Sequence, residues 1–593
     1  MDPHSATTHE VVNQPRPLVG YNLFETNRAM RDALQLNAPG LDLAELAALG
    51  ATLGTPEMQT HARLANTHTP QLHTHDRFGR RIDQVEFHPS YHALMSAAVG
   101  AGLHGSPWSN GAHAHLRRAA GFMMFTEVEP STLCPISMSY AVTPALQGNP
   151  AIAAQWMPLL ASREYDPSLK LFTHKPGVTM GMGMTEKQGG SDVRANTTRA
   201  EFDGDDAWGR RFRITGHKWF FSAPMCDAFL ILAQATPSVR AEPVEAWPEP
   251  VEAGLANPST SSGRTGLVAQ ATPTSMTAGG LSCFFLPRVL PDGKLNTIHI
   301  QRLKDKLGNK ANASSEVEFH GAQAWLVGEE GRGIPQILEM GVMTRLDCAL
   351  GTSGLMRQAL TIALNHAAQR SAFGKPLIAQ PLMRNVLADL ALESEASTVL
   401  ALRLAHAFDD TTSPHEAVMR RVLTPVAKYW ICKRGSHFAQ EAMECLGGNG
   451  YVEEGGEGIM ARIYREMPLN SIWEGAGNIM ALDLLRAIRK ADTGAALSQE
   501  LQPAKGAHPA LDRLVNALPA RVEAMATELE ARRLAQDVAL AVQAALLFQS
   551  APAAVFNAFC DSRIAGNWGH AFGTLAASTD FDTIIQRAMP NGG

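Results

Sequence analysis

The spacing of apolar residues changes twice along the chain, and these changes limit the folds that it can adopt. Residues 1–180 hold Ala- and Leu-rich stretches typical of helices, separated by polar and Pro-containing segments. Residues 181–325 instead carry short runs of β-branched and aromatic side chains, which favour strands. Helical spacing returns after residue 330. Together, these changes predict an α+β protein in which a strand-rich domain separates two helical parts.

Two patterns in the later helical part are particularly regular. Leu382, Val386 and Leu390 recur at intervals of four, and Pro381 precedes them where the first turn of a helix tolerates proline. Beyond residue 500, apolar side chains step by three and four in two consecutive stripes, which predict a C-terminal helical domain or hairpin. The stripes are Val515, Leu518, Val522, Met525 and Leu529, then Leu534, Val538, Val542 and Leu546.

The pattern predicts four segments along the chain. They are an N-terminal extension and helical domain at 1–180, a β-domain at 181–325, a helical bundle at 326–490 and a C-terminal helical extension at 491–593. Within the β-domain, residues 236–278 are rich in Pro, Ser, Thr, Gly and Ala and repeat the unit Glu-Pro-Val-Glu-Ala. Such a composition cannot bury much apolar surface, so we expect a disordered insert between two strands.

Charge and cysteine content exclude several classes of protein. The formal charge of -6 gives no overall attraction for nucleic acid, although a local basic patch stays open as an alternative. Seven cysteines without a Cys-x-x-Cys pair fit neither a disulfide framework nor a zinc site, and they indicate a reducing cytoplasm. No stretch reaches the roughly 18 to 20 apolar residues that a membrane span requires, and no signal peptide is recognisable.

A glycine-rich segment at the start of the strand-rich domain is the most informative motif. It reads Met182-Gly-Met-Thr-Glu-Lys-Gln-Gly-Gly-Ser-Asp-Val193. Its glycines let main-chain N–H groups approach a ligand closely, while Thr185 and Ser191 add hydroxyl groups suited to a flavin edge and a pyrophosphate. A polar surface turn is the alternative interpretation.

Two further segments are candidates for the same site. Gly216-His-Lys-Trp-Phe-Phe-Ser222 is rich in aromatic residues, which a plain buried strand would also explain. Tyr464-Arg-Glu-Met-Pro-Leu-Asn-Ser-Ile-Trp-Glu-Gly-Ala-Gly-Asn-Ile479 contains Glu474 beside a glycine. Burial can raise the pKa of such a glutamate toward neutrality, which suits proton abstraction next to a thioester carbonyl. The alternative is a loop carboxylate that makes a cap or an ion pair.

With 308–319, 370–377 and 446–451, these segments resemble the acyl-CoA dehydrogenase family over most of residues 60–490. The resemblance implies FAD as the cofactor and an acyl-CoA or related small molecule as the substrate. It also implies an N-terminal helical domain, a middle β-barrel-like domain and a C-terminal helical bundle, here with a further C-terminal helical extension. Glu474 stands where the family keeps its catalytic base.

The resemblance further implies which residues contact the cofactor. In the family, an Arg-x-x-Phe-Gly segment reaches the FAD pyrophosphate of a neighbouring subunit, so Arg370 implies a shared site and a homotetramer. Two departures stand out, since Lys187 replaces a family proline and Thr344 stands where some relatives place the base. The implied contacts are Met182, Gly183, Met184, Thr185, Gly190, Ser191, Phe220, Phe221, Ser222, Arg370, Phe373, Gly447, Gly448, Ile472, Trp473, Gly475 and Asn478.

The departures are most similar to a bacterial alkylation-response branch of this family, for which DNA binding through a basic C-terminal surface is proposed. Here residues 501–593 contain 7 Lys plus Arg against 8 Asp plus Glu, so no basic tail supports that role. The candidates for contacts with duplex DNA are Arg434, Arg486 and Arg489, in clusters that also include Lys428. Two hypotheses stay open: a flavoenzyme acting on acyl thioesters, and a DNA-binding flavoprotein with incidental turnover.

Overall fold

The structure, a computed structural model, describes most of the chain. The described residues are 8–109, 111–236, 280–453, 459–489, 492–523 and 527–590. All of the predicted disordered insert at 236–278 except Thr236 lies outside these ranges. Within the described ranges, no helix is both long enough and apolar enough to cross a membrane.

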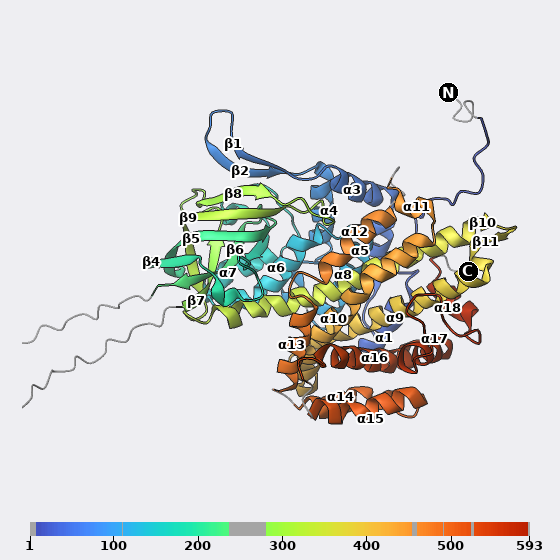
Figure 1. The fold of residues 1–593 in the computed structure, drawn as a ribbon. Coiled ribbons are helices and arrows are strands. Elements are labelled where there is room, and N and C mark those ends of the chain that lie inside the picture. Colours follow the sequence, from blue (N-terminus) through green and yellow to red (C-terminus); the bar gives the residue numbers. More distant parts are fainter. Residues whose placement is uncertain are drawn as a thin grey trace, which may run out of the picture.

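The N-terminal part is mainly helical, as predicted, but it also contains a β-hairpin that the sequence pattern did not reveal (Figure 1). Strands β1 (Gln71–His75) and β2 (Arg81–Glu86) pair antiparallel, and Figure 1 shows the hairpin projecting from the body. Most of its side chains are exposed or half-buried, so no regular apolar alternation marks it in the sequence. The helices are α1 (Arg28–Asn37), α2 (Ala44–Leu53), α3 (Pro56–Thr67), α4 (Pro89–Gly100), α5 (Ala114–Val128), α6 (Leu133–Leu146) and α7 (Pro150–Ala161).

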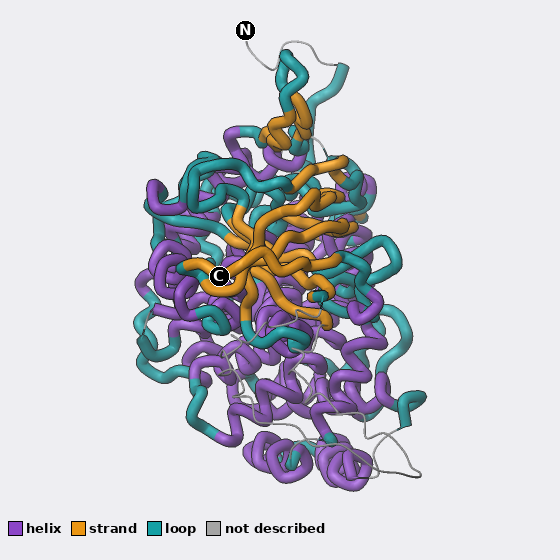
Figure 2. Tube along the Cα trace, turned by 90° about the vertical axis from the view of Figure 1, so that its left-hand side faces the viewer, coloured by secondary structure: helices purple, strands orange, loops and turns teal. Residues whose placement is uncertain are grey.

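The strands of the middle part form one sheet that closes on itself. Its order is β3-β6-β4-β5-β9-β7, and β7 also pairs with β6, while β8 is added at β9. The result agrees with the expected β-barrel-like domain, and Figure 2 shows the strands gathered together with helices behind and below them. β6 and β7 are buried along nearly their whole length and form its core. The strands are β3 (Met180–Gly183), β4 (Arg199–Asp206), β5 (Gly209–Ser222), β6 (Ala228–Ala235), β7 (Gly280–Pro287), β8 (Ile298–Leu303) and β9 (Ser314–Val327).

Long helices pack side by side to form the next part (Figure 1). α8 contacts β7 near its start and runs to the opposite end of the molecule, where a short hairpin of β10 and β11 follows it. α10 contacts α8, α9, α12 and α13, and therefore lies at the centre of the bundle. Pro381 occupies the first turn of α9, as the sequence predicts. The elements are α8 (Gly333–Gln369), β10 (Ser371–Ala372), β11 (Lys375–Pro376), α9 (Pro381–Asp409), α10 (Pro414–Glu444), α11 (Gly448–Tyr451), α12 (Ile459–Asn470) and α13 (Gly477–Ile488).

The C-terminal extension is helical, and its two predicted stripes lie in α15 and α16. α16 packs against α9 and α10, and its residues Leu534, Val538 and Val542 are fully buried. The first predicted stripe is wrong at its last residue, because Leu529 lies in a turn and is 96 % exposed, while Met525 lies outside the described residues. The helices are α14 (Thr493–Leu501), α15 (Pro509–Glu523), α16 (Ala531–Ser550), α17 (Ala553–Phe559) and α18 (Phe581–Ala588).

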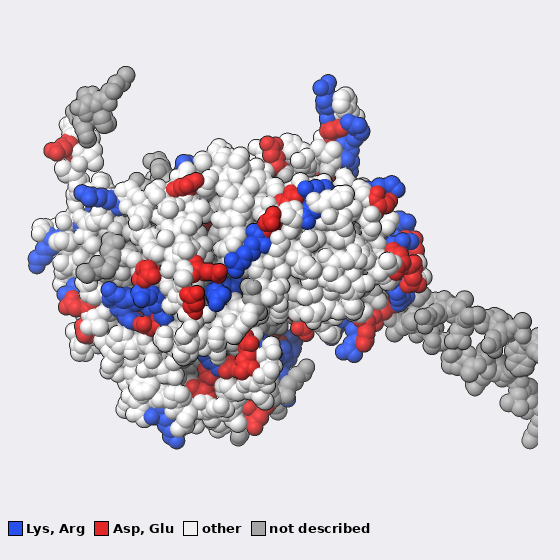
Figure 3. Space-filling model, turned by 180° about the vertical axis from the view of Figure 1, so that it is seen from behind, with Lys and Arg blue, Asp and Glu red and all other residues white. Residues whose placement is uncertain are grey.

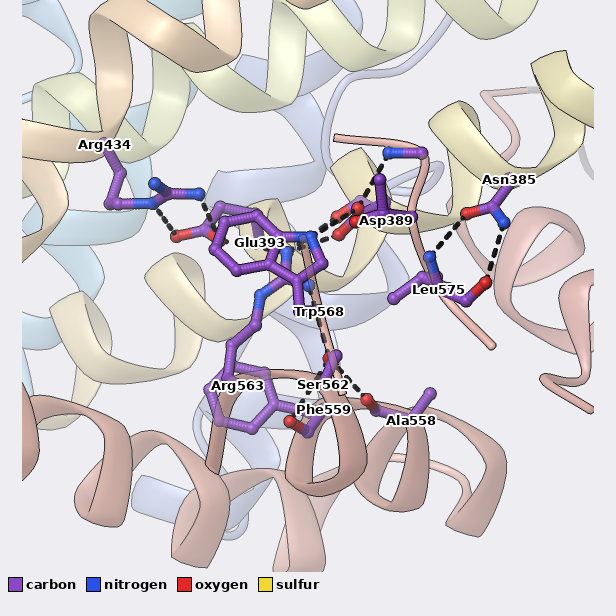
Figure 4. Close-up of polar contacts among 12 residues, drawn as sticks. Asn385, Asp389, Glu393, Arg434, Ala558, Phe559, Ser562, Arg563, Trp568 and Leu575 are labelled. Carbon is purple, nitrogen blue, oxygen red and sulfur yellow. Dashed lines mark hydrogen bonds and ion pairs between the residues drawn. The ribbon is translucent and has the colours of Figure 1, made fainter. Parts of the chain in front are cut away.

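A buried polar cluster holds the C-terminal extension against α9 and α10 (Figure 4). Arg563 lies 2.5 Å from Asp389 and 3.1 Å from Glu393. Arg434 pairs with Glu393 at 3.1 Å, and the Trp568 indole donates a hydrogen bond to Asp389 at 2.9 Å. We call these five residues the docking cluster. Two arginines face two carboxylates, so charge is balanced inside it.

Candidate active site

Glu474 lies in the turn between α12 and α13, and it is only partly exposed. Its Oε2 accepts a hydrogen bond of 2.7 Å from the hydroxyl of Thr344 on α8. Within the described part of the chain it makes no ion pair, so the alternative of an ion-paired loop carboxylate does not apply. Burial raises the pKa of Glu474, while Thr344 and then two nearby cations oppose that rise.

Two buried or half-buried cations hold the backbone around Glu474. The φ angle of Glu474 is 58°, a left-handed conformation that costs a non-glycine residue about 1 to 3 kcal/mol and persists only where contacts enforce it. Lys428 donates to the carbonyls of Trp473, at 2.7 Å, and Gly475. Arg345 donates to the carbonyl of Glu474 itself at 2.9 Å. These contacts fix the position of the carboxylate without neutralising it.

The glycine-rich segment forms a turn directly after β3. Glu186 is fully buried, and Lys218 of β5 lies 2.8 Å from it. Burial would raise the pKa of Glu186, but the Lys218 charge and several hydrogen bonds outweigh that effect and lower the pKa to about 2. A Cβ at Gly190 would lie 2.5 Å from the Thr185 hydroxyl, so a larger residue there would displace the Thr185 side chain. Gly190 and Ser191 are exposed and open to a ligand.

Strand β5 lies beside this turn, because the Trp219 N–H donates to the Thr185 carbonyl at 2.8 Å. Successive side chains of a strand alternate between its faces. Accordingly, Phe220 is 52 % exposed and Ser222 is half-buried, whereas the ring of Phe221 is fully buried. The Phe221 side chain faces the barrel core, and its carbonyl accepts a hydrogen bond from the Ser315 hydroxyl at 2.8 Å, so the predicted contact of Phe221 with the cofactor has no support here.

The open face of Thr185, Phe220 and Ser222 fits the flavin ring that the family implies. An exposed aromatic ring offers a flat apolar surface, the two hydroxyls offer hydrogen bonds, and the glycine turn lets main-chain groups come close. Behind this face, Met182 and Gly183 are buried in β3, and Met184 is half-buried. These three residues support the face from inside.

Helix α6 lies between the two halves of the site, because it contacts both β3, next to the glycine-rich turn, and α8, which carries Thr344. Burial raises the pKa of the Cys134 thiol on α6 to about 12. Of the predicted residues near Glu474, Ile472, Trp473 and Gly475 lie in the same turn and Asn478 lies in the first turn of α13; Ile472 is 61 % exposed and Asn478 is exposed.

The remaining predicted contacts lie at the far end of the molecule. Phe373, in the loop between β10 and β11, is 99 % exposed, and Gly447 and Gly448 are exposed at the start of α11. Figure 1 shows β10, β11 and α11 at the end opposite the barrel strands. Arg370 donates to the carbonyl of Asn13 at 2.9 Å and to the side-chain oxygen of Gln14 at 3.1 Å. Within one chain, these groups are therefore separated from the β5 face.

The three candidates for DNA contacts differ in their surroundings. Arg434 belongs to the docking cluster, where its ion pair with Glu393 and the rings of Trp568 and Phe572 occupy it, so it is not a surface cation. Arg486 and Arg489 are exposed on α13. Figure 3 shows basic and acidic side chains interspersed on the face in view. Lys428, from the same predicted clusters, is 1 % exposed and serves the Glu474 turn.

Sequence reasoning did not assign Thr344, Arg345 or Lys428 to the environment of Glu474. All three act across 45 or more positions of the chain, so no local spacing connects them with it. A basic residue in a mostly apolar helix was the available signal for Lys428, because burying such a charge requires a partner.

Comparison with known proteins gives the family. Residues 13–167 match the adaptive response protein AidB N-terminal domain, 181–247 the acyl-CoA dehydrogenase middle domain and 331–489 the acyl-CoA dehydrogenase C-terminal domain. AidB of Escherichia coli (strain K12) is 47 % identical over 88 % of this chain and 88 % of that protein. The chain belongs to the acyl-CoA dehydrogenase family. Its N-terminal match and its similarity to AidB assign it to the AidB type.

Solved structures agree on the acyl-CoA dehydrogenase fold. Caenorhabditis elegans ACDH-11 in complex with C11-CoA covers 99 % of this chain and 95 % of its own, with a TM-score of 0.76 and 23 % identity. The Bacillus anthracis acyl-CoA dehydrogenase complexed with FAD covers 95 % of this chain and 84 % of its own, with a TM-score of 0.58 and 16 % identity. FAD is the cofactor of this family, and the residues of the β5 face fit it.

Proposed function

We propose that this protein binds FAD at the β5 face and oxidises an acyl-CoA thioester, with Glu474 as the base. The observation that carries this proposal is the environment of Glu474: a carboxylate held by its backbone, bonded to one neutral hydroxyl and given a raised pKa by burial. A carboxylate with a raised pKa is a stronger base than an ordinary surface carboxylate. Helix α6 contacts both β3, next to the glycine-rich turn, and α8, which carries the Thr344 partner of Glu474.

The proposed reaction removes a proton from the α carbon of the thioester and a hydride from the β carbon. Bound FAD supplies the hydride acceptor. Glu474 takes the α proton, and its fixed turn determines where that proton must lie. Thr344 donates to the carboxylate form of Glu474, which favours that form and partly opposes the rise in pKa caused by burial. Phe220 and Ser222 would orient the cofactor from the barrel side.

We also propose that the site is shared between protomers of a homotetramer. Arg370, Phe373, Gly447 and Gly448 lie away from the β5 face of their own chain, which suits contacts with the cofactor of a neighbouring copy. The side chain of Gln14 accepts from Arg370 at 3.1 Å and lies 3.4 Å from the Asn449 amide. Light scattering of the FAD-loaded protein would show a tetramer if this proposal is correct, and a monomer would contradict it.

Anaerobic mixing with acyl-CoAs of graded chain length tests the reaction. At least one member of the panel should bleach the visible absorbance of the bound flavin and yield the α,β-unsaturated thioester, identified by mass spectrometry. A flavin that stays oxidised with every member, in a protein fully loaded with FAD, would overturn the proposed dehydrogenation.

A DNA-binding role in the alkylation response is the second candidate. Its support is the similarity to AidB together with the exposed Arg486 and Arg489. The two arginines could make two phosphate contacts. So few contacts would give weak, salt-sensitive binding. Titration of the protein with duplex DNA at low ionic strength tests this candidate function. Absence of binding would exclude it.

Two further proposals concern organisation and location. We keep the four predicted segments, 1–180, 181–325, 326–490 and 491–593, as the domain organisation, and the position of the strands between the two sets of helices supports it. We also keep the cytoplasmic location, for which the support is that all seven cysteines are buried and free.

A further inference from the structure

An open cavity of about 760 Å³ lies between the end of α3, the connection from β8 to β9 and the start of α12. None of the predicted cofactor contacts lines it. It adjoins them at one point, because Ser314 lines the cavity and its hydroxyl oxygen lies 3.3 Å from that of Ser222. The proposed proton and hydride transfers make no use of this space.

Basic side chains dominate the charged lining of the cavity. Two acidic residues, Asp305 and Glu453, contribute to the described lining. An excess of one sign of charge in a concave site attracts ligands of the opposite sign. The basic residues are Arg63, Lys304, Lys306, Lys310, Arg462 and Arg465.

Three of these six cations already have a carboxylate partner, so they add little to the attraction for a ligand. Their ion pairs are short and each involves one acidic residue. The pairs are Lys304 with Glu316 at 2.5 Å, Lys310 with Asp305 at 2.7 Å and Arg465 with Glu453 at 2.5 Å.

The other three cations have no carboxylate in contact within the described part of the chain. Lys306 donates to the Asn312 carbonyl at 2.5 Å, and Arg462 donates to the Val128 carbonyl at 3.0 Å. The side chain of Arg63 makes neither a hydrogen bond nor an ion pair with any described residue. Burial lowers the pKa of Lys306 to about 8 and lowers that of Arg462 as well. Both charges are thus desolvated without full compensation.

The nearest other carboxylates are engaged elsewhere. Glu466 accepts from the side chain of Asn309 at 3.0 Å and from its backbone N–H. Glu129 accepts from the backbone N–H groups of Ser131 at 3.0 Å and Thr132 at 2.7 Å. Residues 454–458, which adjoin the lining in sequence and add two glutamates, lie outside the described residues.

We propose that this cavity binds an oxyanion, a carboxylate or a phosphate group, through Arg63, Lys306 and Arg462. An oxyanion supplies the charged acceptors that these three donors lack. The cavity adjoins the candidate cofactor face, because Ser314 of its lining lies 3.3 Å from Ser222. Two sources fit this chemistry: a free oxyanion, and an acyl thioester whose far end carries a carboxylate. The second source rests on the proposed function.

Calorimetric titration of the FAD-loaded protein with inorganic phosphate at low ionic strength tests the free-oxyanion source. We expect saturable binding that Arg63→Gln and Lys306→Gln each weaken about tenfold or more, which corresponds to one lost charge-assisted hydrogen bond. Arg332→Gln is the matched control, because Arg332 is exposed and lies outside the cavity. If Lys306→Gln unfolds, as thermal melting would show, Arg63→Gln decides alone, since it removes no internal contact of the described structure.

The second arm compares two acyl-CoAs of equal chain length, one ending in a methyl group and the other in a carboxylate. A preference for the carboxylate that both variants abolish, with no phosphate binding, identifies the substrate as the source. The inference is overturned if phosphate does not bind and the two thioesters bind equally, or if the variants bind like the unaltered protein. Both arms measure binding, so their results test the oxyanion site even if the protein does not dehydrogenate any acyl-CoA.

Discussion

The Glu474 turn and the docking cluster both keep charged groups inside the protein, but they treat those charges differently. In the docking cluster, Arg563 lies within 3.1 Å of two carboxylates, so each charge has an opposite partner. Around Glu474, Lys428 and Arg345 donate to backbone carbonyls, and Arg345 also pairs with Asp483 at 3.0 Å. Among the described residues, the Glu474 carboxylate itself receives only the Thr344 hydroxyl. Balanced charges stabilise a fixed fold, whereas a carboxylate without an ion pair can gain and lose a proton.

The largest expected effect is the loss of turnover in Glu474→Gln. This change keeps the shape of the side chain but removes its basicity, and general bases contribute about 10² to 10⁴-fold to rate. We expect the rate of flavin bleaching by a reactive acyl-CoA to fall by about that factor. FAD content should be unchanged, because Glu474 is fixed through its backbone. Turnover near that of the unaltered protein would exclude Glu474 as the base.

The next effect concerns stability and should come from the docking cluster. Arg563→Met leaves Asp389 and Glu393 with one cation between them, and breaking a buried ion pair costs about 3 to 5 kcal/mol. Chemical denaturation should show this loss of unfolding free energy, while Arg332→Met, at an exposed site, should change it by less than about 0.5 kcal/mol. Equal stability of the two variants would show that the cluster does not hold the C-terminal extension.

A smaller effect should appear in the pH dependence of Thr344→Val. The base acts as a carboxylate, so the rate should rise with pH as Glu474 ionises. The Thr344 hydroxyl stabilises that carboxylate, and its removal should raise the pKa of Glu474 further. The rising limb of the pH–rate profile should therefore move to higher pH, with a rate at neutral pH lower by roughly tenfold. A profile that does not move would show that Thr344 does not act on the base.

The smallest effect belongs to the DNA-binding alternative, which predicts that Arg489→Gln weakens binding of duplex DNA and reduces the slope of its salt dependence by about 1. Arg434→Gln is the informative comparison, because Arg434 is held in the docking cluster. It should lower stability without a direct effect on DNA binding. The reverse result would contradict this assignment of the two arginines.

Much of the fold could be predicted because hydrophobic spacing reports local structure. Pro381 at the start of α9 and the buried stripe of α16 follow directly from it. The β1–β2 hairpin could not be found in this way, because its side chains are mostly polar and even its buried positions include the charged Asp83. The position of Leu529 in an exposed turn was also not predictable, since an apolar side chain fits a stripe whether or not it is buried.

The candidate site was predictable where motifs carry it and not where tertiary contacts make it. The glycine turn and β5 are each marked by a motif, and the Trp219 N–H bond to Thr185 and the Lys218–Glu186 ion pair join them. The contact of Arg434 with Glu393 spans 41 positions of the chain. The residues next to Arg434 in sequence therefore do not show whether it is a surface cation or a buried one. The cavity proposed to bind an oxyanion is lined by three separate segments of the chain, so no local motif predicts it either.

Hydrogen exchange at the α carbon of an acyl-CoA tests most directly whether Glu474 is the base, because it isolates proton removal from hydride transfer. A thioester analogue that cannot be oxidised would be incubated with the FAD-loaded protein in D₂O, and deuterium at the α carbon would be followed by NMR. We predict exchange with the unaltered protein and at least a hundredfold slower exchange with Glu474→Gln, as expected for loss of a general base. Equal exchange by the two proteins, or none by either, would contradict the assignment of Glu474 as the base.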